Sequence, residues 1–111
     1  MKRKRKVSIW VGPPGKAVRL VEKEVFGEAT VLDVVRDLSS ISYQSRGRYH
    51  LDLLSVGPLE RKKDEVFVYL LRWFRDRKLK EIENINPASL IVPFWDVDLY
   101  ILLEPLFLYQ D

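Results

Sequence analysis

The chain has 111 residues, of which 47% are hydrophobic and thirteen are aromatic, and its formal net charge is +3. This size and apolar content are typical of a single domain with one core, and they argue against a chain that is disordered throughout. The absence of cysteine excludes disulfides, Cys-based zinc sites and thiol catalysis and favours a cytoplasmic protein, while no apolar run approaches the length of a membrane span.

The N-terminus is strongly basic. Its five consecutive cations are Lys2, Arg3, Lys4, Arg5 and Lys6. We expect residues 1–6 to form a solvated, disordered tail, because like charges repel one another and offer nothing to a core. Such a tail can also meet an anionic partner.

Two alternating stretches follow the tail. Residues 7–11 place their apolar side chains on one side and predict a strand. Two glycines and two prolines break the chain at residues 12–16, and alternation resumes over residues 17–26. The pattern predicts a β-hairpin, and the slip in alternation at Leu20 and Val21 indicates a bulge.

The middle of the chain contains the clearest predicted helix, at residues 30–40. Thr30 has the properties of an N-cap, and Asp33 completes a capping box three residues later. The polar residues 42–48 predict a loop, and residues 49–56 predict a strand that Gly-Pro ends.

Residues 59–83 are open to two interpretations. No Gly or Pro interrupts them, so a long helix is possible. The β-branched and aromatic run inside them instead favours a buried strand at residues 65–74. We favour that strand, followed by a turn at residues 75–78 and a short element at residues 79–85.

The end of the chain predicts one more strand, at residues 96–103, which Pro105 ends. We expect residues 7–105 to form one domain and residues 106–111 to form an apolar tail. A protein interface is the predicted role of four tail residues: Leu106, Phe107, Leu108 and Tyr109.

The charge is distributed unevenly along the chain. Residues 61–80 carry +5, whereas residues 81–111 carry no Lys or Arg and a charge of −6. One interpretation is that the two segments form neighbouring strands whose opposite charges face each other. The other is a basic face for an anionic partner, with Arg72, Arg75, Arg77 and Lys78 as candidates.

The order of hairpin, capped helix and later strands resembles the β-grasp, or ubiquitin-like, fold. Residues 28–38 (EATVLDVVRDL) are similar to the helix entry of sulfur-carrier-like and cobalamin-transport-like β-grasp domains. The Asp-Val-Asp at residues 96–98 resembles the acidic turn before their final strand. The resemblance implies an α+β fold in which a mixed sheet of four to five strands packs on one main helix, at residues 30–40.

Two branches of that superfamily imply different functions. Sulfur carriers and ubiquitin-like modifiers resemble this chain but need a C-terminal Gly-Gly, whose carboxylate is adenylated. This chain ends Leu-Tyr-Gln-Asp and contains no Gly-Gly, which argues against carrier activity. The sequence is compatible with the other branch, the ligand-binding and cobalamin-carrier-like modules, which bind through the sheet and its loops.

Three possible catalytic or metal-binding motifs lack what their chemistry needs. The Gly-Pro-Pro-Gly-Lys at residues 12–16 has two residues between its glycines, whereas a phosphate-binding loop needs four and a Ser or Thr after the lysine. His50 is the only histidine, so a zinc site or a catalytic triad has no further ligand or partner. Asp96 and Asp98 could bind a hard cation, but a turn into a strand accounts for them as well. We expect no enzyme activity, cofactor or metal.

Two binding functions remain. The first is a protein-binding or self-associating module that uses the apolar tail. The second is a nucleic-acid accessory protein that uses the basic tail and residues 61–80, where Tyr69 and Trp73 accompany arginines. The scarcity of amides and methionine beside 32% charged residues also favours a hyperthermophilic source. Trp10 and Trp95 are expected to be packing residues.

Overall fold

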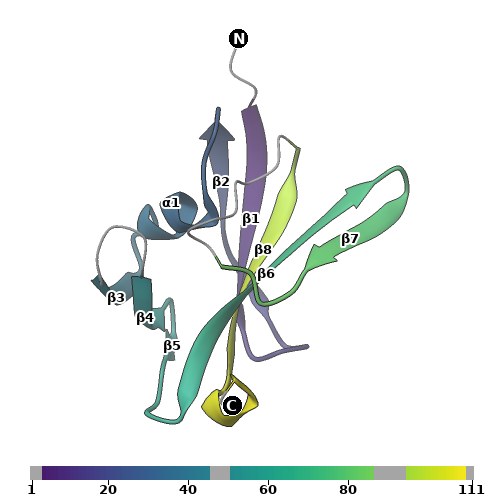
Figure 1. Ribbon diagram of the computed structural model, residues 1–111. Coiled ribbons are helices and arrows are strands. Elements are labelled where there is room, and N and C mark those ends of the chain that lie inside the picture. The colour runs from purple at the N-terminus through teal and green to yellow at the C-terminus, as the bar shows by residue number, and fades with distance from the viewer. Residues whose placement is uncertain (1–3, 46–50, 87–94, 110–111) are drawn as a thin grey trace.

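The computed structural model describes residues 4–45, 51–86 and 95–109 (Figure 1). Eight strands and two short helices follow one another within these ranges. In chain order they are β1 (Lys4–Gly12), β2 (Val18–Phe26), α1 (Val31–Arg36), β3 (Ile41–Ser45), β4 (Leu51–Val56), β5 (Leu59–Glu60), β6 (Glu65–Arg75), β7 (Lys78–Ile82), β8 (Val97–Pro105) and the 3-10 helix η1 (Leu106–Tyr109).

Five strands form a large mixed sheet in the order β2-β1-β8-β6-β7. β1 and β8 lie parallel in its centre, with Val7 opposite Val97, and the other pairs are antiparallel. The remaining strands form a small sheet in the order β3-β4-β5. The predicted α+β class and five-stranded mixed sheet are confirmed, whereas the sequence did not predict the small sheet.

The first hairpin forms as its alternation predicts. Ile9 pairs with Val21 and Trp10 pairs with Arg19, so Leu20 is the extra residue of a bulge. The predicted slip in register is therefore confirmed. Because of the bulge, the consecutive residues Leu20 and Val21 can both pack against the core.

The helix α1 begins as predicted but ends early. Thr30 Oγ1 accepts a hydrogen bond from Asp33 N–H at 3.1 Å, and Asp33 Oδ2 accepts one from Thr30 N–H at 2.9 Å, which confirms the capping box. The helix ends at Arg36 rather than near residue 40, because Leu38 N–H bonds to Val35 O and tightens the last turn. Leu38 still reaches the core from that turn.

The predicted disordered tail is wrong for residues 4–6, and residues 1–3 lie outside the described ranges. β1 begins at Lys4, and strand alternation places Arg5 on the same side as Val7, where it is 1% exposed. Arg5 Nη1–H donates to Gly27 O at 2.6 Å, and burial lowers the pKa of its guanidinium. Lys4 pairs with Glu24 at 3.0 Å. Residues 4–6 thus belong to the sheet, where Glu24 on β2 and Gly27 directly after it bind the side chains of Lys4 and Arg5.

The predicted loop at residues 42–48 is wrong where the structure describes it. Residues 42–45 belong to β3, which pairs with β4 through Ser42 opposite Ser55 and Gln44 opposite Asp52. Side chains of β3 are mostly exposed, so the strand has no apolar alternation for a sequence pattern to detect.

The strand interpretation of residues 59–83 is confirmed. β6 and β7 form a hairpin whose flanking pair is Arg75 and Lys78. The two residues between them, Asp76 and Arg77, have positive φ angles of 52° and 65°, as a type I′ turn requires. The long-helix alternative is wrong, because strand pairing satisfies the backbone of this segment.

Replacing Arg77 with glycine is expected to stabilise the hairpin. A left-handed conformation costs a side chain-bearing residue about 1–2 kcal/mol, and the added chain entropy of glycine offsets part of the gain. The net expectation is a free energy of unfolding higher by about 0.5–1 kcal/mol, measured by urea denaturation. An unchanged or lower denaturation midpoint would show that the turn is not strained at Arg77.

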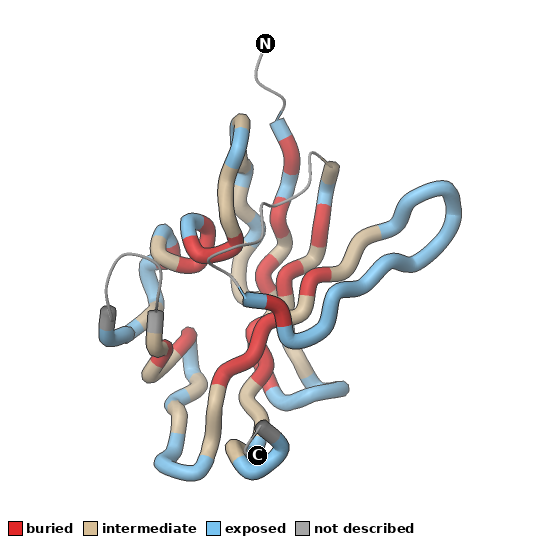
Figure 2. The backbone as a smooth tube through the Cα atoms, in the orientation of Figure 1, coloured by how far each residue is buried: buried red, intermediate tan, exposed pale blue. Residues whose placement is uncertain are grey.

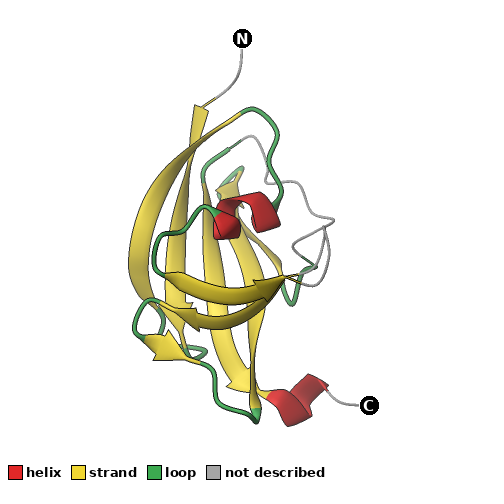
Figure 3. Ribbon diagram, turned by 90° about the vertical axis from the view of Figure 1, so that its left-hand side faces the viewer, coloured by secondary structure: helices red, strands yellow, loops and turns green. Residues whose placement is uncertain are grey.

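The core lies between the large sheet, α1 and the small sheet, which cover one face of the large sheet (Figure 3). Alternate residues of β1, β8 and β6 point into it, including Ile9, Leu99 and Leu71. Tyr69 on β6 is also buried. Burial, and then the negative charge of Asp52, raise the pKa of the Tyr69 phenol.

This buried phenol predicts a loss of stability in alkali. In the unfolded chain a tyrosine ionises near pH 10, but folded Tyr69 keeps its proton above that pH. The stabilisation that the protonated phenol gives the folded state is therefore complete below pH 10 and declines as the pH rises further. When the pH is raised from 8 to 11, the free energy of unfolding of the original chain should fall. In Tyr69→Phe, which lacks the phenol, that fall should be smaller by about 1.4 kcal/mol. Urea denaturation at both pH values measures this, and parallel pH profiles would contradict it.

Candidate binding surface

The face of the large sheet opposite the core has no helix over it among the described residues (Figure 3). Strand alternation assigns to this face the residues between the core positions of the three inner strands. We call it the open face and define it by Lys6, Ser8, Trp10, Asp98, Tyr100, Leu102, Leu70, Arg72 and Phe74.

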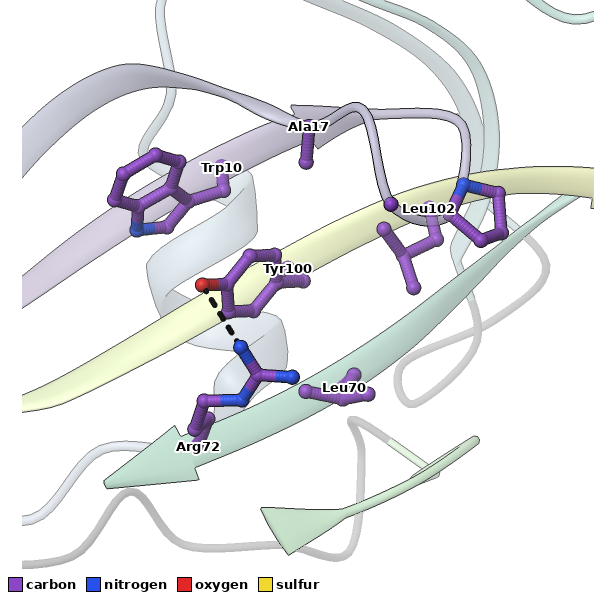
Figure 4. Close-up of a pocket in the computed structure, with 8 residues that line it drawn as sticks. Trp10, Ala17, Leu70, Arg72, Tyr100 and Leu102 are labelled. Atoms are coloured by element: carbon purple, nitrogen blue, oxygen red, sulfur yellow. Dashed lines mark hydrogen bonds between the residues drawn. The ribbon is translucent and has the colours of Figure 1, made fainter. Parts of the chain in front are cut away.

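Three side chains of the open face form a stack. The rings of Trp10 and Tyr100 are nearly parallel, with centroids 5.7 Å apart and an interplanar angle of 17°. The Arg72 guanidinium carbon lies 4.9 Å from the centre of the Tyr100 ring. Figure 4 shows how the three side chains converge from neighbouring strands. Offset stacking and cation–π contact both favour this geometry.

Hydrogen bonds fix the stack in place. Trp10 Nε1–H donates to Asp98 Oδ1 at 3.1 Å, and Arg72 donates to the Tyr100 hydroxyl at 3.4 Å and to Glu81 Oε1 at 2.6 Å. Burial by itself lowers the pKa of Arg72, but its bond to Glu81 and the charges of Glu81 and Tyr100 outweigh burial and raise that pKa. Arg72 therefore stays cationic, and the stack is rigid without a ligand.

The stack borders a hollow of about 400 Å³ whose lining is mixed, polar as well as apolar. The β1–β2 turn forms one wall with Pro14 and Ala17, while Leu70 and Leu102 lie on the sheet side (Figure 4). This volume falls within the roughly 300–1,000 Å³ of ligand pockets, and the mixture of apolar walls with a few polar groups, those of Trp10, Tyr100 and Arg72, is typical of them.

A second hollow of about 320 Å³ adjoins the first and shares Arg72 with it. Its charged lining consists of Lys6, Glu22, Asp96 and Asp98 beside Arg72. The Lys6 backbone N–H donates to Asp96 Oδ1 at 2.8 Å. Because Glu81 compensates Arg72, this lining has a formal charge of −2.

The structure separates the cations that the sequence grouped together. Arg72 belongs to the open face, Arg5 is buried, and Lys4 is paired with Glu24. Arg75, Arg77 and Lys78 lie at the exposed end of the β6–β7 hairpin. Lys2 and Arg3 lie outside the described residues. The predicted cations therefore do not form one binding face.

The predicted apolar tail forms η1, and Leu106 N–H donates to Asp64 O at 2.8 Å. Phe107 is 70% and Leu108 58% exposed, and the Tyr109 side chain lies outside what is described. Two such side chains, even when fully covered, supply about 300 Å². A stable interface needs roughly 800 Å² from each partner. These two described side chains by themselves are therefore too small for a stable protein interface.

The sequence interpretation missed the stack, because it treated Trp10 as a packing residue and did not consider Tyr100. A signal was present in the alternation of β1, since Trp10 lies between the core positions Ile9 and Val11. The same alternation in β8 turns Tyr100 away from the core.

No group of three or more His, Cys, Asp or Glu side chains suited to a metal ion occurs in residues 4–45, 51–86 and 95–109, and His50 lies outside those ranges. Within the same ranges, no helix is long and apolar enough to span a membrane. Comparison of the chain with protein-family models and with curated proteins finds no match.

Proposed function

We propose that the protein is a non-enzymatic binding module that holds an extended segment of a protein partner on its open face. One observation carries the proposal: a hydrogen-bonded stack of Trp10, Tyr100 and Arg72 borders a hollow on a sheet face that no helix of the described residues covers. Because these side chains are held before binding, they lose little conformational entropy when a ligand packs on them. Aromatic and arginine anchors are also the residues that dominate protein interfaces.

The charges of the open face favour a protein partner there over a nucleic acid. Asp96, Asp98 and Glu22 line the second hollow and would repel a phosphate backbone. The same carboxylates attract a lysine or arginine side chain. An apolar anchor in the first hollow and a cation in the second therefore describe the ligand.

The spacing of the two hollows gives the ligand's length. Tyr100 and Leu102 line the first hollow, and Asp96 and Asp98 line the second. Four residues along this part of the chain cover about 13 Å, and an extended peptide has the same rise of about 3.3 Å per residue. The partner segment should therefore carry an apolar residue and a Lys or Arg about four positions apart.

Selection of a phage-displayed random peptide library on the purified chain tests the proposal. Enriched peptides are expected to bind Tyr100→Ser at least ten-fold more weakly in fluorescence anisotropy, because the anchor contact is lost. Tyr43→Ser is the matched control, since Tyr43 is exposed on the small sheet. Peptides that bind the Tyr100 variant as tightly as the original chain would rule out the open face.

A second substitution tests the charge. Asp98→Asn keeps an oxygen that accepts from Trp10 Nε1–H and removes only the negative charge. We expect peptides with the basic residue to bind it about three- to ten-fold more weakly, with a smaller salt dependence. If peptides that lack a basic residue lose the same affinity for Asp98→Asn, the assignment of the second hollow to a cation is contradicted.

The proposal includes a β-grasp-like architecture and a cytoplasmic location. The order of hairpin and helix, and a last strand parallel to the first in the sheet centre, support the β-grasp comparison. The small sheet and the six-residue α1 are departures from one main helix packed on the sheet. The absence of cysteine supports the location.

A further inference from the structure

The end of the β6–β7 hairpin extends beyond the open face, although Phe74 belongs to both and Trp73 and Phe74 line the second hollow. We call residues 73–80 the hairpin arm. Figure 2 shows the arm projecting from the body, and all of its residues from Phe74 onward are exposed. Its last six residues hold four cations, Arg75, Arg77, Lys78 and Lys80, against one anion, Asp76. Residues 4–9 also carry +3, but there Arg5 is buried and Lys4 is paired with Glu24.

The two faces of the arm differ in chemistry. Residues opposite each other in an antiparallel pair share a face, so Trp73 with Lys80 and Arg75 with Lys78 lie together. Trp95 joins that face, with its ring 6.1 Å from Trp73 and 4.8 Å from the Arg75 guanidinium carbon. The opposite face is apolar and presents Phe74, 71% exposed, with Leu79. One face therefore combines indole rings with three cations.

The turn supplies an independent observation. Asp76 and Arg77 adopt left-handed backbone conformations that glycine would adopt more readily. The side chain at residue 77 therefore costs stability, yet it adds a cation at the outermost point of the arm. The hairpin turn requires this conformation, and the chain places a cation there instead of the glycine that would be more stable.

We infer that the hairpin arm binds single-stranded nucleic acid, with Arg75, Arg77, Lys78 and Lys80 on the phosphates and the indoles beside the bases. Alternating cations along a ribbon match a backbone that carries one charge per nucleotide, and aromatic rings accept unpaired bases of any sequence. A peptide needs no such series of cations. This inference does not rest on the peptide-binding function of the open face.

Fluorescence anisotropy with a labelled 20-nucleotide oligo(dT) tests the inference on the full chain. Four phosphate contacts predict a slope near −2.8 in a plot of log affinity against log salt, so binding weakens about 50-fold between 50 and 200 mM KCl. The Lys78→Gln/Lys80→Gln variant should reduce that slope by about 1.4. An abasic strand of the same length should bind at least five-fold more weakly, because it cannot stack.

Two further variants separate binding from folding and from the open face. Arg77→Gly is expected to be more stable than the original chain and yet to bind oligo(dT) more weakly, which a loss of folding cannot produce. Tyr100→Ser should leave oligo(dT) binding unchanged, so the two proposals can fail separately. Salt-independent binding, an unchanged slope in the double variant, or equal or tighter binding of a 20-base-pair duplex would each overturn the inference.

Discussion

Replacing Arg5 with glutamate is expected to destabilise the fold by at least about 3 kcal/mol, because it leaves a buried charge without a matching partner. Arg5 is fully covered on the core side of β1, and its guanidinium donates to the Gly27 carbonyl. A carboxylate in the same place would face that carbonyl oxygen and could accept nothing from it. Urea denaturation followed by tryptophan fluorescence measures the change.

Arg5→Met distinguishes charge from packing. Methionine keeps most of the apolar volume and removes the buried charge, but it leaves the Gly27 carbonyl without this donor, so we expect it to cost about 1–3 kcal/mol, less than glutamate. Lys6→Gln is the matched control, since the neighbouring residue is exposed. A glutamate variant as stable as Lys6→Gln would show that Arg5 is not in the core.

Leu71→Ala is expected to cost about 2–5 kcal/mol. Leu71 is fully buried on the core side of β6, and its loss removes apolar contacts and leaves a cavity in the core beside that strand. Chemical denaturation of the purified variant measures the cost. A loss of that size is a large part of the stability of a typical domain.

Phe74→Ala provides the comparison three residues along the same strand. Phe74 lies on the opposite face and is exposed, so its removal should change the free energy of unfolding by no more than about 0.5 kcal/mol. Similar losses at Leu71 and Phe74 would contradict the assignment of the two faces of β6, and with it the position of the open face.

The sequence predicted correctly those elements that depend on residues close together in the chain. The β1–β2 hairpin, its bulge at Leu20 and the capped start of α1 depend on neighbouring residues, and the structure confirms them. The parallel pairing of β1 with β8 joins residues ninety positions apart, which no local pattern encodes. The strand β3 was missed because exposed polar residues form it through pairing with β4.

The uneven charge distribution has a partly structural explanation. The basic strand β6 lies between β7 and β8, so Arg72 is opposite Asp98 and forms an ion pair with Glu81. The interpretation of neighbouring, oppositely charged strands is therefore confirmed at Arg72. It does not extend to the hairpin arm, where β6 and β7 reach past β8 and both carry cations.

Sequence reasoning reached the candidate surfaces only in part. It selected Arg72 because of its charge, but the partner Tyr100 is distant in the chain and becomes a neighbour only through the pairing of β6 with β8. Arg5 was selected as a binding residue and is instead buried, since a run of cations does not reveal that one of them alternates into a core.

The three tryptophans allow one measurement to test the central claim that the open face holds a peptide segment. The Trp10 indole N–H is on the open face, where it donates to Asp98, whereas Trp73 and Trp95 lie together at the hairpin arm. In a ¹⁵N-resolved NMR titration with a selected peptide, we predict that the Trp10 indole resonance shifts and that the resonance of Trp95, which lines neither hollow, does not. An unmoved Trp10 resonance at saturating peptide would contradict the proposed binding surface.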